Sequence, residues 1–291
     1  MQRRPRLLVL GGSGQLGQAI TRDREAVNFE IFAPPSSEID VRDSTALLSI
    51  IGDVRPDRVI NCAAFTAVDR AETERDRAFA INAEGARNVA MACDRSAVYL
   101  IHISTDYVFD GESDRPYRED DVAKPINVYG ESKLLGEQYV ALNAPNSCVL
   151  RVSWLFGSSP SSFVAKIVAR AQRHEPLRVV DDQLGCPTST AGLAAALMRI
   201  VQERDLPTGS FHFCGQPTTT WFGFAAEIVR QAYDSGVLES KVEVAPISSS
   251  ELESPTRRPK YSVLDAAKIE ARLRIGRDRW LDRLPQVLRH A

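Results

Sequence analysis

Residues 7–17 read LLVLGGSGQLG and give the strongest indication of the fold class. Its four apolar residues, 7–10, are typical of a strand buried on both faces of a parallel sheet. The glycines that follow fit the spacing GxGxxG, in which a tight turn, a close backbone approach and helix-on-strand packing each need glycine. A helix beginning there would turn free N–H groups toward a pyrophosphate. We therefore expect a dinucleotide at this turn; a glycine turn without a ligand is the alternative.

Apolar runs alternate with helical patterns through the first half of the chain. The patterns predict strands at 7–10, 29–33, 58–61, 98–103 and 148–152, with helices at 15–24, 44–51, 78–93 and 128–142. Strands that alternate with helices form a parallel sheet covered on both faces. The predicted fold class is therefore α/β, a Rossmann-type doubly wound parallel sheet with a smaller C-terminal substrate-binding lobe.

The second half is less regular. It suggests helices at 163–173, 192–202, 222–233, 265–272 and 278–289, short strands at 177–180 and 210–213, and mainly loop at 245–259. We expect an NAD(P)-binding Rossmann domain over residues 1–152, to which parts of 175–215 return. Residues 153–291 are expected to form mainly the substrate-binding lobe.

Composition narrows the class of protein. A net charge of -2 over 291 residues argues against binding to nucleic acid or to an anionic membrane surface. No apolar run reaches the length of a membrane span. The five cysteines are widely spaced and form no CxxC pair, which argues against a disulfide framework or a zinc site. We expect a cytoplasmic protein without a protein-bound metal.

Tyr129 and Lys133 stand four residues apart within a predicted helix. This spacing places a phenol and an ammonium on one helix face. An ordinary tyrosine, with a pKa of about 10, is a sluggish acid at neutral pH, and a nearby cation stabilises its phenolate. Beside a nucleotide-binding turn, we interpret the pair as proton-transfer groups. A surface pair without a function is the alternative.

Small and hydroxyl-bearing residues follow two of the predicted strands. The third strand runs into residues 63–66 (AAFT), and the fourth ends in Ser104 and Thr105. Ligands of open α/β sheets bind beyond the carboxyl ends of the strands. We expect Thr105 or Ser104 to donate a hydrogen bond to a substrate carbonyl, and the small residues to lie against a cofactor. A hydroxyl that caps the loop backbone is the alternative for Thr105.

The end of the second predicted strand bears on the choice of cofactor. It reads Ala33-Pro34-Pro35, without the carboxylate that would bind the ribose 2′-OH of NAD. No arginine stands there to bind a 2′-phosphate either. The missing carboxylate favours NADPH, with NADH as the alternative.

Together these motifs resemble the extended short-chain dehydrogenase/reductase family, and the longer strings resemble its dTDP-4-dehydrorhamnose reductase branch. The matches run from the first strand almost to the C-terminus. They are GGSGQLG (11–17), NCAAFTAVD (61–69), STDYVF (104–109), PINVYGESKLLGE (125–137), RVSWLF (151–156), DQLGCPT (182–188), TTTW (218–221) and RRP (257–259).

The resemblance implies a catalytic triad of Tyr129, Lys133 and Thr105. Tyr129 would protonate the sugar C4 oxygen, Lys133 would hold the nicotinamide ribose and lower the tyrosine pKa, and Thr105 would polarise the carbonyl. Tyr129 and Lys133 would thus touch the cofactor too. The remaining implied cofactor contacts are Gly11, Gly14, Gln15, Leu16, Gly17, Asp40, Val41, Ala63, Ala64, Phe65 and Thr66.

The resemblance also implies contacts to a dTDP-sugar substrate. These would come from Thr105, Asp106 and Trp154, for which a core aromatic is the alternative. Arg258 would bind the substrate diphosphate, because arginine suits bidentate phosphate contacts. Its neighbour Arg257 remains an alternative for that contact, and a pair that is merely solvated in its loop is the other alternative.

Two positions separate this chain from its relatives. Sugar-nucleotide dehydratases of the superfamily carry glutamate where this chain has Tyr107, and a tyrosine cannot replace a carboxylate base at neutral pH without a large pKa shift. Some family members bind magnesium through glutamates, one of them in the first helix. Here that helix continues with residues 18–20 (QAI), and residues 189–191 read STA. We expect no magnesium site of that type, and a homodimer is left open.

The expected function is NAD(P)H-dependent reduction of dTDP-4-dehydro-β-L-rhamnose to dTDP-L-rhamnose. One alternative is a sister reductase that acts on another dTDP-4-keto-6-deoxysugar. The other is a non-catalytic, NADP-binding regulatory subunit resembling that of methionine adenosyltransferase, which the intact Thr105/Tyr129/Lys133 set does not exclude.

Overall fold

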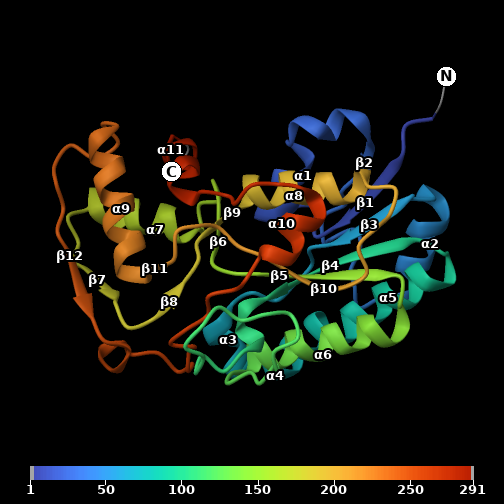
Figure 1. Ribbon diagram of the computed structural model, residues 1–291, viewed down its shortest axis with the longest axis horizontal. Coiled ribbons are helices and arrows are strands. Elements are labelled where there is room, and N and C mark those ends of the chain that lie inside the picture. The colour runs from blue at the N-terminus through green and yellow to red at the C-terminus, as the bar shows by residue number, and fades with distance from the viewer. Residues whose placement is uncertain (1–2, 290–291) are drawn as a thin grey trace.

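A parallel sheet of six strands forms the centre of the computed structural model, which describes residues 3–289 (Figure 1). Residues 1, 2, 290 and 291, at the ends of the two predicted domains, lie outside the described residues. The strand order is β10-β5-β4-β3-β1-β2. The strands are β1 (Arg6–Leu10), β2 (Glu30–Phe32), β3 (Arg58–Asn61), β4 (Tyr99–Thr105), β5 (Ser147–Val152) and β10 (Gly209–Phe213). The predicted doubly wound sheet is confirmed.

Helices cover both faces of this sheet, and β1 shows why. Successive strand residues point to opposite faces, so Leu7 and Val9 join the core under α1 (Gln15–Thr21) and α8 (Thr190–Gln202). Leu8 and Leu10 join the core on the other face. That face is covered by α2 (Ser44–Val54), α5 (Gly85–Arg95) and α6 (Val128–Asn143). In Figure 1, α1 and α8 lie above the sheet, and α5 and α6 lie below it.

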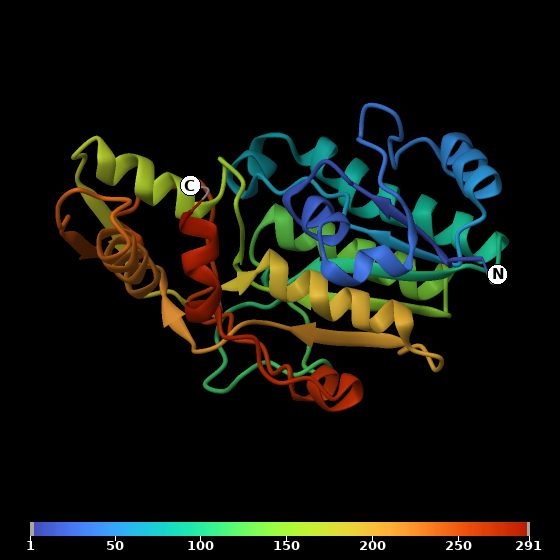
Figure 2. The ribbon, with the colours of Figure 1, turned by 90° about the horizontal axis from the view of Figure 1, so that it is seen from above.

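A smaller lobe with its own hydrophobic core stands beside the sheet (Figure 2). Three helices build most of that core: α7 (Phe163–Gln172), α9 (Trp221–Asp234) and α11 (Trp280–Leu288). The remaining elements of the C-terminal half are β6 (Leu155–Phe156), β7 (Leu177–Val180), β8 (Leu184–Gly185), β9 (Thr188–Ser189), β11 (Thr219–Thr220), β12 (Val244–Ile247), a 3-10 turn (Ser249–Glu251) and α10 (Ala267–Leu273).

Three details differ from the sequence-based predictions. A strand, β12, lies in the stretch expected to be mainly loop, and it pairs with β7 in the small lobe. Pro246 masked it, because proline is tolerated only at sheet edges, and a two-stranded sheet consists of edges. Of the two strands predicted within 175–215, only β10 joins the large sheet.

The helix predicted over 78–93 is interrupted. It divides into α4 (Arg75–Phe79), a π-helical turn (Ala80–Glu84) and α5. A π turn contains one extra residue and so shifts the helical period. The apolar pattern of the sequence continues without a break, so it does not reveal this shift. Further short elements had not been predicted, among them a 3-10 turn (Arg24–Asn28), α3 (Val68–Thr73) and a 3-10 turn (Asp106–Val108).

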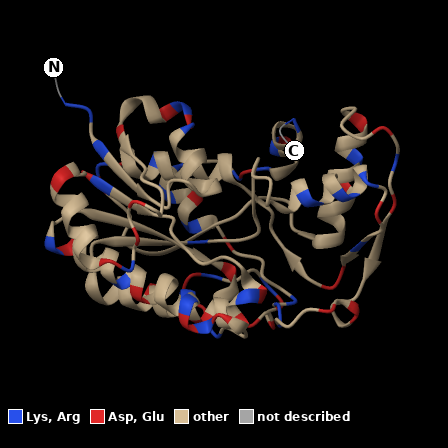
Figure 3. Ribbon diagram, turned by 180° about the vertical axis from the view of Figure 1, so that it is seen from behind, with Lys and Arg blue, Asp and Glu red and all other residues tan. Residues whose placement is uncertain are grey.

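Charged residues of both signs are interspersed over the helices and loops (Figure 3). Many of them pair with one another, as Arg230 does with Glu227 and Asp234. Within residues 3–289 we find no helix with the length and apolar character needed to cross a membrane.

One ion pair lies inside the fold, between α6 and β5. The Arg151 guanidinium donates to both carboxylate oxygens of Glu137, with a closest distance of 2.8 Å, and both side chains are at most 7% exposed. The hydroxyl of Ser104 donates to Glu137 at 2.5 Å, and the ring of His212 contacts Arg151 at 3.3 Å. These extra partners satisfy the buried charges and fix α6 over β4, β5 and β10.

Glu137→Ala should lower the free energy of unfolding by about 3–5 kcal/mol, because it leaves the Arg151 guanidinium buried without its carboxylate. Glu131→Ala on the same helix is the matched control. It removes only a half-exposed pair with Arg75, worth at most about 1 kcal/mol. Urea denaturation of the two variants measures the difference. Equal losses would contradict a structural role for the buried pair.

Candidate active site

A cavity of about 530 Å³ opens where the carboxyl ends of β1, β3, β4 and β5 face the small lobe. Its walls combine the glycine turn, the strand ends, the start of α6 and aromatic residues of the lobe. The lining includes Gly11, Gly14, Gln15, Leu16, Gly17, Cys62, Ala64, Thr66, Ser104, Thr105, Asp106, Tyr107, Tyr129, Lys133, Trp154, Phe163, Trp221 and Arg258.

The glycine turn forms the floor of this cavity beside β3. Gly11 has a φ of 79°, and a Cβ there would lie 2.8 Å from the Ala63 nitrogen, so only glycine fits. Gly14 begins α1 without a side-chain cap, which leaves the first amides of the helix open to a ligand. The Gln15 side-chain oxygen is buried without a hydrogen-bond partner among the described residues. A short backbone cradle with free donors fits the pyrophosphate of a dinucleotide.

The predicted cofactor residues divide into two groups. Nine line the cavity, namely Gly11, Gly14, Gln15, Leu16, Gly17, Ala64, Thr66, Tyr129 and Lys133. Asp40, Val41, Ala63 and Phe65 do not. The Asp40 carboxylate binds the Arg42 guanidinium, the pair lying at the surface beyond β2. The Phe65 amide donates to Asn82 at 2.8 Å, and its side chain is buried.

Tyr129 and Lys133 occupy the first two turns of α6. The Asn127 side chain caps this helix by accepting from the Gly130 amide at 2.8 Å. Lys133 is 2% exposed, and its Nζ donates to the Ile103 carbonyl at 2.6 Å. Burial lowers the pKa of Lys133 to about 8 and raises that of the Tyr129 phenol to about 12. At neutral pH the site therefore holds a protonated phenol and an ammonium that is close to titrating.

Thr105 and Asp106 lie at the end of β4, across the cavity from the glycine turn. The Thr105 hydroxyl donates to Oδ1 of Asp106 at 3.1 Å and accepts from the Tyr107 amide at 3.2 Å. Asp106 is 2% exposed, and its Oδ2 has no partner among the described residues. Burial raises the pKa of this carboxyl to about 7. A ligand hydroxyl is the kind of group that would satisfy the free oxygen.

Trp154 forms the wall on the small-lobe side. Its φ of 46° lies in the left-handed region, which non-glycine residues rarely adopt. The indole stacks on Trp221 with ring centroids 3.7 Å apart. The ring also lies against Gly185, where any Cβ would clash with the indole. The resemblance had included Trp221 only in a matching string without a role, and no local pattern in the sequence joins these two tryptophans.

Of the two neighbouring arginines, Arg258 is the one that lines the cavity. Its guanidinium binds the Asp69 carboxylate at 2.7 Å and the Ser254 hydroxyl at 2.5 Å. Arg257 lines an adjoining groove instead, and its carbonyl accepts from the Asn127 side chain. The Arg258 guanidinium, which lines the cavity, is thus already bound to the Asp69 carboxylate at the surface.

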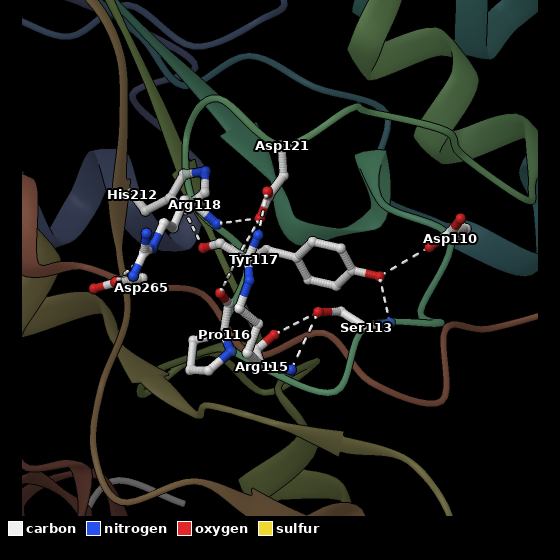
Figure 4. A network of polar contacts seen from close by, with 9 residues as sticks. All are labelled: Asp110, Ser113, Arg115, Pro116, Tyr117, Arg118, Asp121, His212 and Asp265. Atoms are coloured by element: carbon white, nitrogen blue, oxygen red, sulfur yellow. Dashed lines mark hydrogen bonds and ion pairs between the residues drawn. The ribbon is translucent and has the colours of Figure 1, made fainter.

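The loop that follows β4 is anchored by hydrogen bonds to the C-terminal half of the chain (Figure 4). The Tyr117 amide donates to the Val263 carbonyl, and the Asp265 amide donates to the Tyr117 carbonyl, both at 2.8 Å. The Tyr117 hydroxyl donates to Asp110 at 2.8 Å, and the ring of His212 contacts the Tyr117 carbonyl at 3.1 Å. These contacts fix the loop that follows Tyr107.

Tyr107 itself packs edge-on against Tyr129, with ring centroids 5.6 Å apart. Burial raises the pKa of its phenol, so it stays protonated at neutral pH. Within residues 3–289, no cluster of three or more His, Cys, Asp or Glu side chains is arranged to hold a metal ion. The protonated Tyr129 phenol can donate a proton to a carbonyl oxygen, and Thr105 becomes a second donor when its hydroxyl turns from Asp106 to that oxygen.

Comparison with known proteins gives consistent matches over nearly the whole chain. Residues 5–291 match the sequence profile of the RmlD substrate binding domain. The chain is 39% identical over 272 residues to a dTDP-4-dehydrorhamnose reductase of Streptomyces griseus, covering 92% of this chain and 88% of that protein. It is 34% identical over 287 residues to a dTDP-4-keto-6-deoxy-D-glucose reductase of Streptomyces niveus, covering 98% and 93%.

A solved structure agrees in shape as well. The dTDP-4-dehydrorhamnose reductase of Bacillus anthracis, crystallised in complex with NADP, superposes with a TM-score of 0.91 at 32% identity. The alignment covers 99% of this chain and 100% of that one.

Asp106→Asn should stabilise the protein by about 1–3 kcal/mol near pH 8 and much less near pH 5. The folded-state pKa of about 7 lies above the ordinary 3.8, so the folded chain keeps a proton that the unfolded chain releases. Stability is then lost as the pH rises through this window. Thermal unfolding at the two pH values measures the gain. An equal gain at both would show that the buried charge carries no cost.

Proposed function

Because the chain belongs to the RmlD substrate binding domain family, we propose that it reduces dTDP-4-dehydro-β-L-rhamnose to dTDP-L-rhamnose with NADPH. One observation carries the proposal. A single cavity brings together the open glycine turn, the Tyr129/Lys133 pair and Thr105, which are the parts that hydride delivery to a ketone requires.

The proposed reaction needs a hydride and a proton. The glycine turn would hold NADPH, which would supply the hydride for C4 of the sugar. The Tyr129 hydroxyl gives its proton to the C4 oxygen as negative charge develops there. The Thr105 hydroxyl, which donates to Asp106 in the free protein, turns to donate a hydrogen bond to the same oxygen. The Lys133 ammonium stabilises the tyrosinate left behind, which solvent reprotonates. Together the hydride and one proton convert the ketone to an alcohol.

The same residues argue against dehydration. Elimination of water requires a base beside the triad, and the residue at that place is Tyr107, whose protonated phenol cannot act as one at neutral pH. Trp154 contributes an apolar wall beside the sugar, and Arg258 a cation for the diphosphate. Asp106 offers its free oxygen to a sugar hydroxyl.

The Streptomyces niveus relative supports a second candidate substrate, dTDP-4-keto-6-deoxy-D-glucose. This sugar presents the same C4 ketone on a ring of different stereochemistry, and the triad would act on it in the same way. Asp40 and Val41 are proposed to lie near the adenine, and Ala63 and Phe65 to lie along the cofactor. The missing carboxylate at Ala33–Pro35 supports NADPH over NADH.

We place the reaction in the cytoplasm. All five cysteines are free thiols, and burial raises the pKa of Cys62 and Cys93 to about 12. Unpaired thiols suit a reducing compartment.

A direct assay separates the candidates. The purified protein is incubated with NADPH or NADH and each of several dTDP-4-keto-6-deoxysugars, and the loss of nicotinamide absorbance is followed. Turnover with the L-rhamnose precursor in preference to the D-glucose derivative supports the proposal. Turnover only with the latter favours the second candidate. Binding of NADPH without turnover of any sugar would favour a non-catalytic subunit.

Tyr129→Phe should lower kcat by at least about 100-fold, because general-acid catalysis contributes that much, while the Kd for NADPH changes little. Steady-state kinetics and fluorescence titration of NADPH measure the two quantities. Full activity in this variant would exclude Tyr129 as the proton donor.

Activity should fall as the pH rises through about 8, where Lys133 loses its proton. The ammonium is the form that stabilises the tyrosinate, so the active state lies on the acidic side of this pKa. Tyr129, with a pKa of about 12, stays protonated throughout and adds no second limb. A rate that stays constant up to the pKa of an ordinary lysine would contradict a lowered pKa for the buried Lys133 ammonium.

A further inference from the structure

His102 lies directly behind Lys133, on β4, and the proposed mechanism has not used it. It is 1% exposed, and its Nε2 is 3.5 Å from the Lys133 Nζ. Its other ring nitrogen, Nδ1, is 3.2 Å from the side-chain nitrogen of Asn61. The three side chains form a buried row from the end of β3 through β4 to α6.

The orientation of Asn61 settles which ring nitrogen of His102 carries the proton. The Asn61 side-chain oxygen accepts from the Ala63 amide at 3.1 Å, so the amide nitrogen is the atom turned to His102. That nitrogen can only donate, and Nδ1 must therefore accept. A neutral imidazole then carries its proton on Nε2, the atom facing Lys133. Burial, with the Lys133 charge, lowers the pKa of His102 well below its usual value, which keeps the ring neutral.

An N–H group that faces Nζ interacts differently with the two protonation states of Lys133. The ammonium carries only N–H donors, so it cannot accept a hydrogen bond from the His102 N–H. The neutral amine has a lone pair that accepts this N–H, and it still donates to the Ile103 carbonyl at 2.6 Å. The neutral form therefore satisfies every polar atom of the pair, and the charged form does not.

We propose that His102, held by Asn61 with its proton on Nε2, is a positioning residue that favours the neutral amine of Lys133 over the ammonium in the free enzyme. This inference rests on the proposed function, in which Lys133 stabilises the Tyr129 phenolate. It extends that function by naming what brings the lysine close to titration besides burial alone. A bound coenzyme would then lie beside a lysine that loses its proton more readily than an ordinary lysine.

The other groups around Lys133 differ in which of its protonation states they favour. Glu137, one turn further along α6, favours the ammonium, but its carboxylate is bound to Arg151 and Ser104. Cys62, after β3, remains a neutral thiol because burial raises its pKa to about 12. Tyr129, on the preceding turn, is a neutral phenol with a pKa of about 12. Of these neighbours, only His102 presents an N–H to Nζ.

The first test needs no catalysis. Long-range proton–nitrogen NMR of protein labelled with ¹⁵N-histidine distinguishes the two neutral tautomers, and His102→Gln identifies the signal. The expected pattern is a neutral ring protonated on Nε2. A ring protonated on Nδ1, or a charged imidazolium near neutral pH, would overturn the inference even if the enzyme reduces its substrate.

The second test reverses the tautomer. Asn61→Asp keeps an acceptor for the Ala63 amide but offers a carboxylate to Nδ1, which moves the ring proton there and turns an Nε2 lone pair toward Lys133. The alkaline limb of kcat/KM, which reports the free enzyme, should move up by about 1 pH unit or more. An unmoved limb in a variant whose NMR shows the reversed tautomer would contradict control by His102.

Asn82→Asp is the matched control. Asn82 is equally buried and hydrogen-bonds Phe65 and Ser132 without contacting His102 or Lys133. The Asn82→Asp substitution introduces a buried carboxylate near α6 but does not change the His102 tautomer. The alkaline limb of its kcat/KM profile should therefore lie at the same pH as that of the wild type. A shift equal to that of Asn61→Asp would assign the effect to charge alone and overturn the inference. Absence of turnover in the wild type would instead count against the proposed function, with the NMR result still deciding the tautomer.

Discussion

The parallel alignment of β1, β3, β4 and β5 is the constraint on which the site depends. Parallel strands end at one edge of the sheet, so the glycine turn, the small residues after β3 and the Ser104–Asp106 corner meet there although they are far apart in sequence. The helix α6 must return across β4 to enter β5, and this return brings Tyr129 and Lys133 over the same edge. The small lobe then closes the cavity with Trp154 and Trp221.

Burial at this edge divides the polar groups into two kinds. Glu137 and Arg151 neutralise each other and hold α6 in place. Asp106, Lys133 and the oxygen of Gln15 face the cavity with incomplete partners or displaced pKa values. Groups of the first kind hold the scaffold, and those of the second kind have the shifted pKa values and free atoms typical of ligand-binding sites. The buried ion pair thus stabilises the fold beneath the site, and two buried oxygens without a partner, on Gln15 and Asp106, lie within it.

The sequence predicted the elements whose signals are local. The apolar strand with its glycine turn and the four-residue spacing of Tyr129 and Lys133 needed no tertiary information. Proline hid β12, and a π turn divided a helix that the apolar pattern presented as continuous. The stacking of Trp154 on Trp221, the choice of Arg258 over Arg257 for the cavity wall, and the contact of His102 with Lys133 depend on chain segments that meet only on folding. No spacing rule encodes such contacts.

The proposed reaction requires one cavity that holds the coenzyme and the sugar ketone face to face, with Tyr129 as the acid between them. Its most direct test uses NADPH carrying deuterium at the reactive position of the nicotinamide, with dTDP-4-dehydrorhamnose as the acceptor. Nuclear magnetic resonance of the purified product should show a single deuterium bonded to C4 of the sugar. A product that carries no deuterium at C4, or an unchanged sugar with intact coenzyme, would contradict the account.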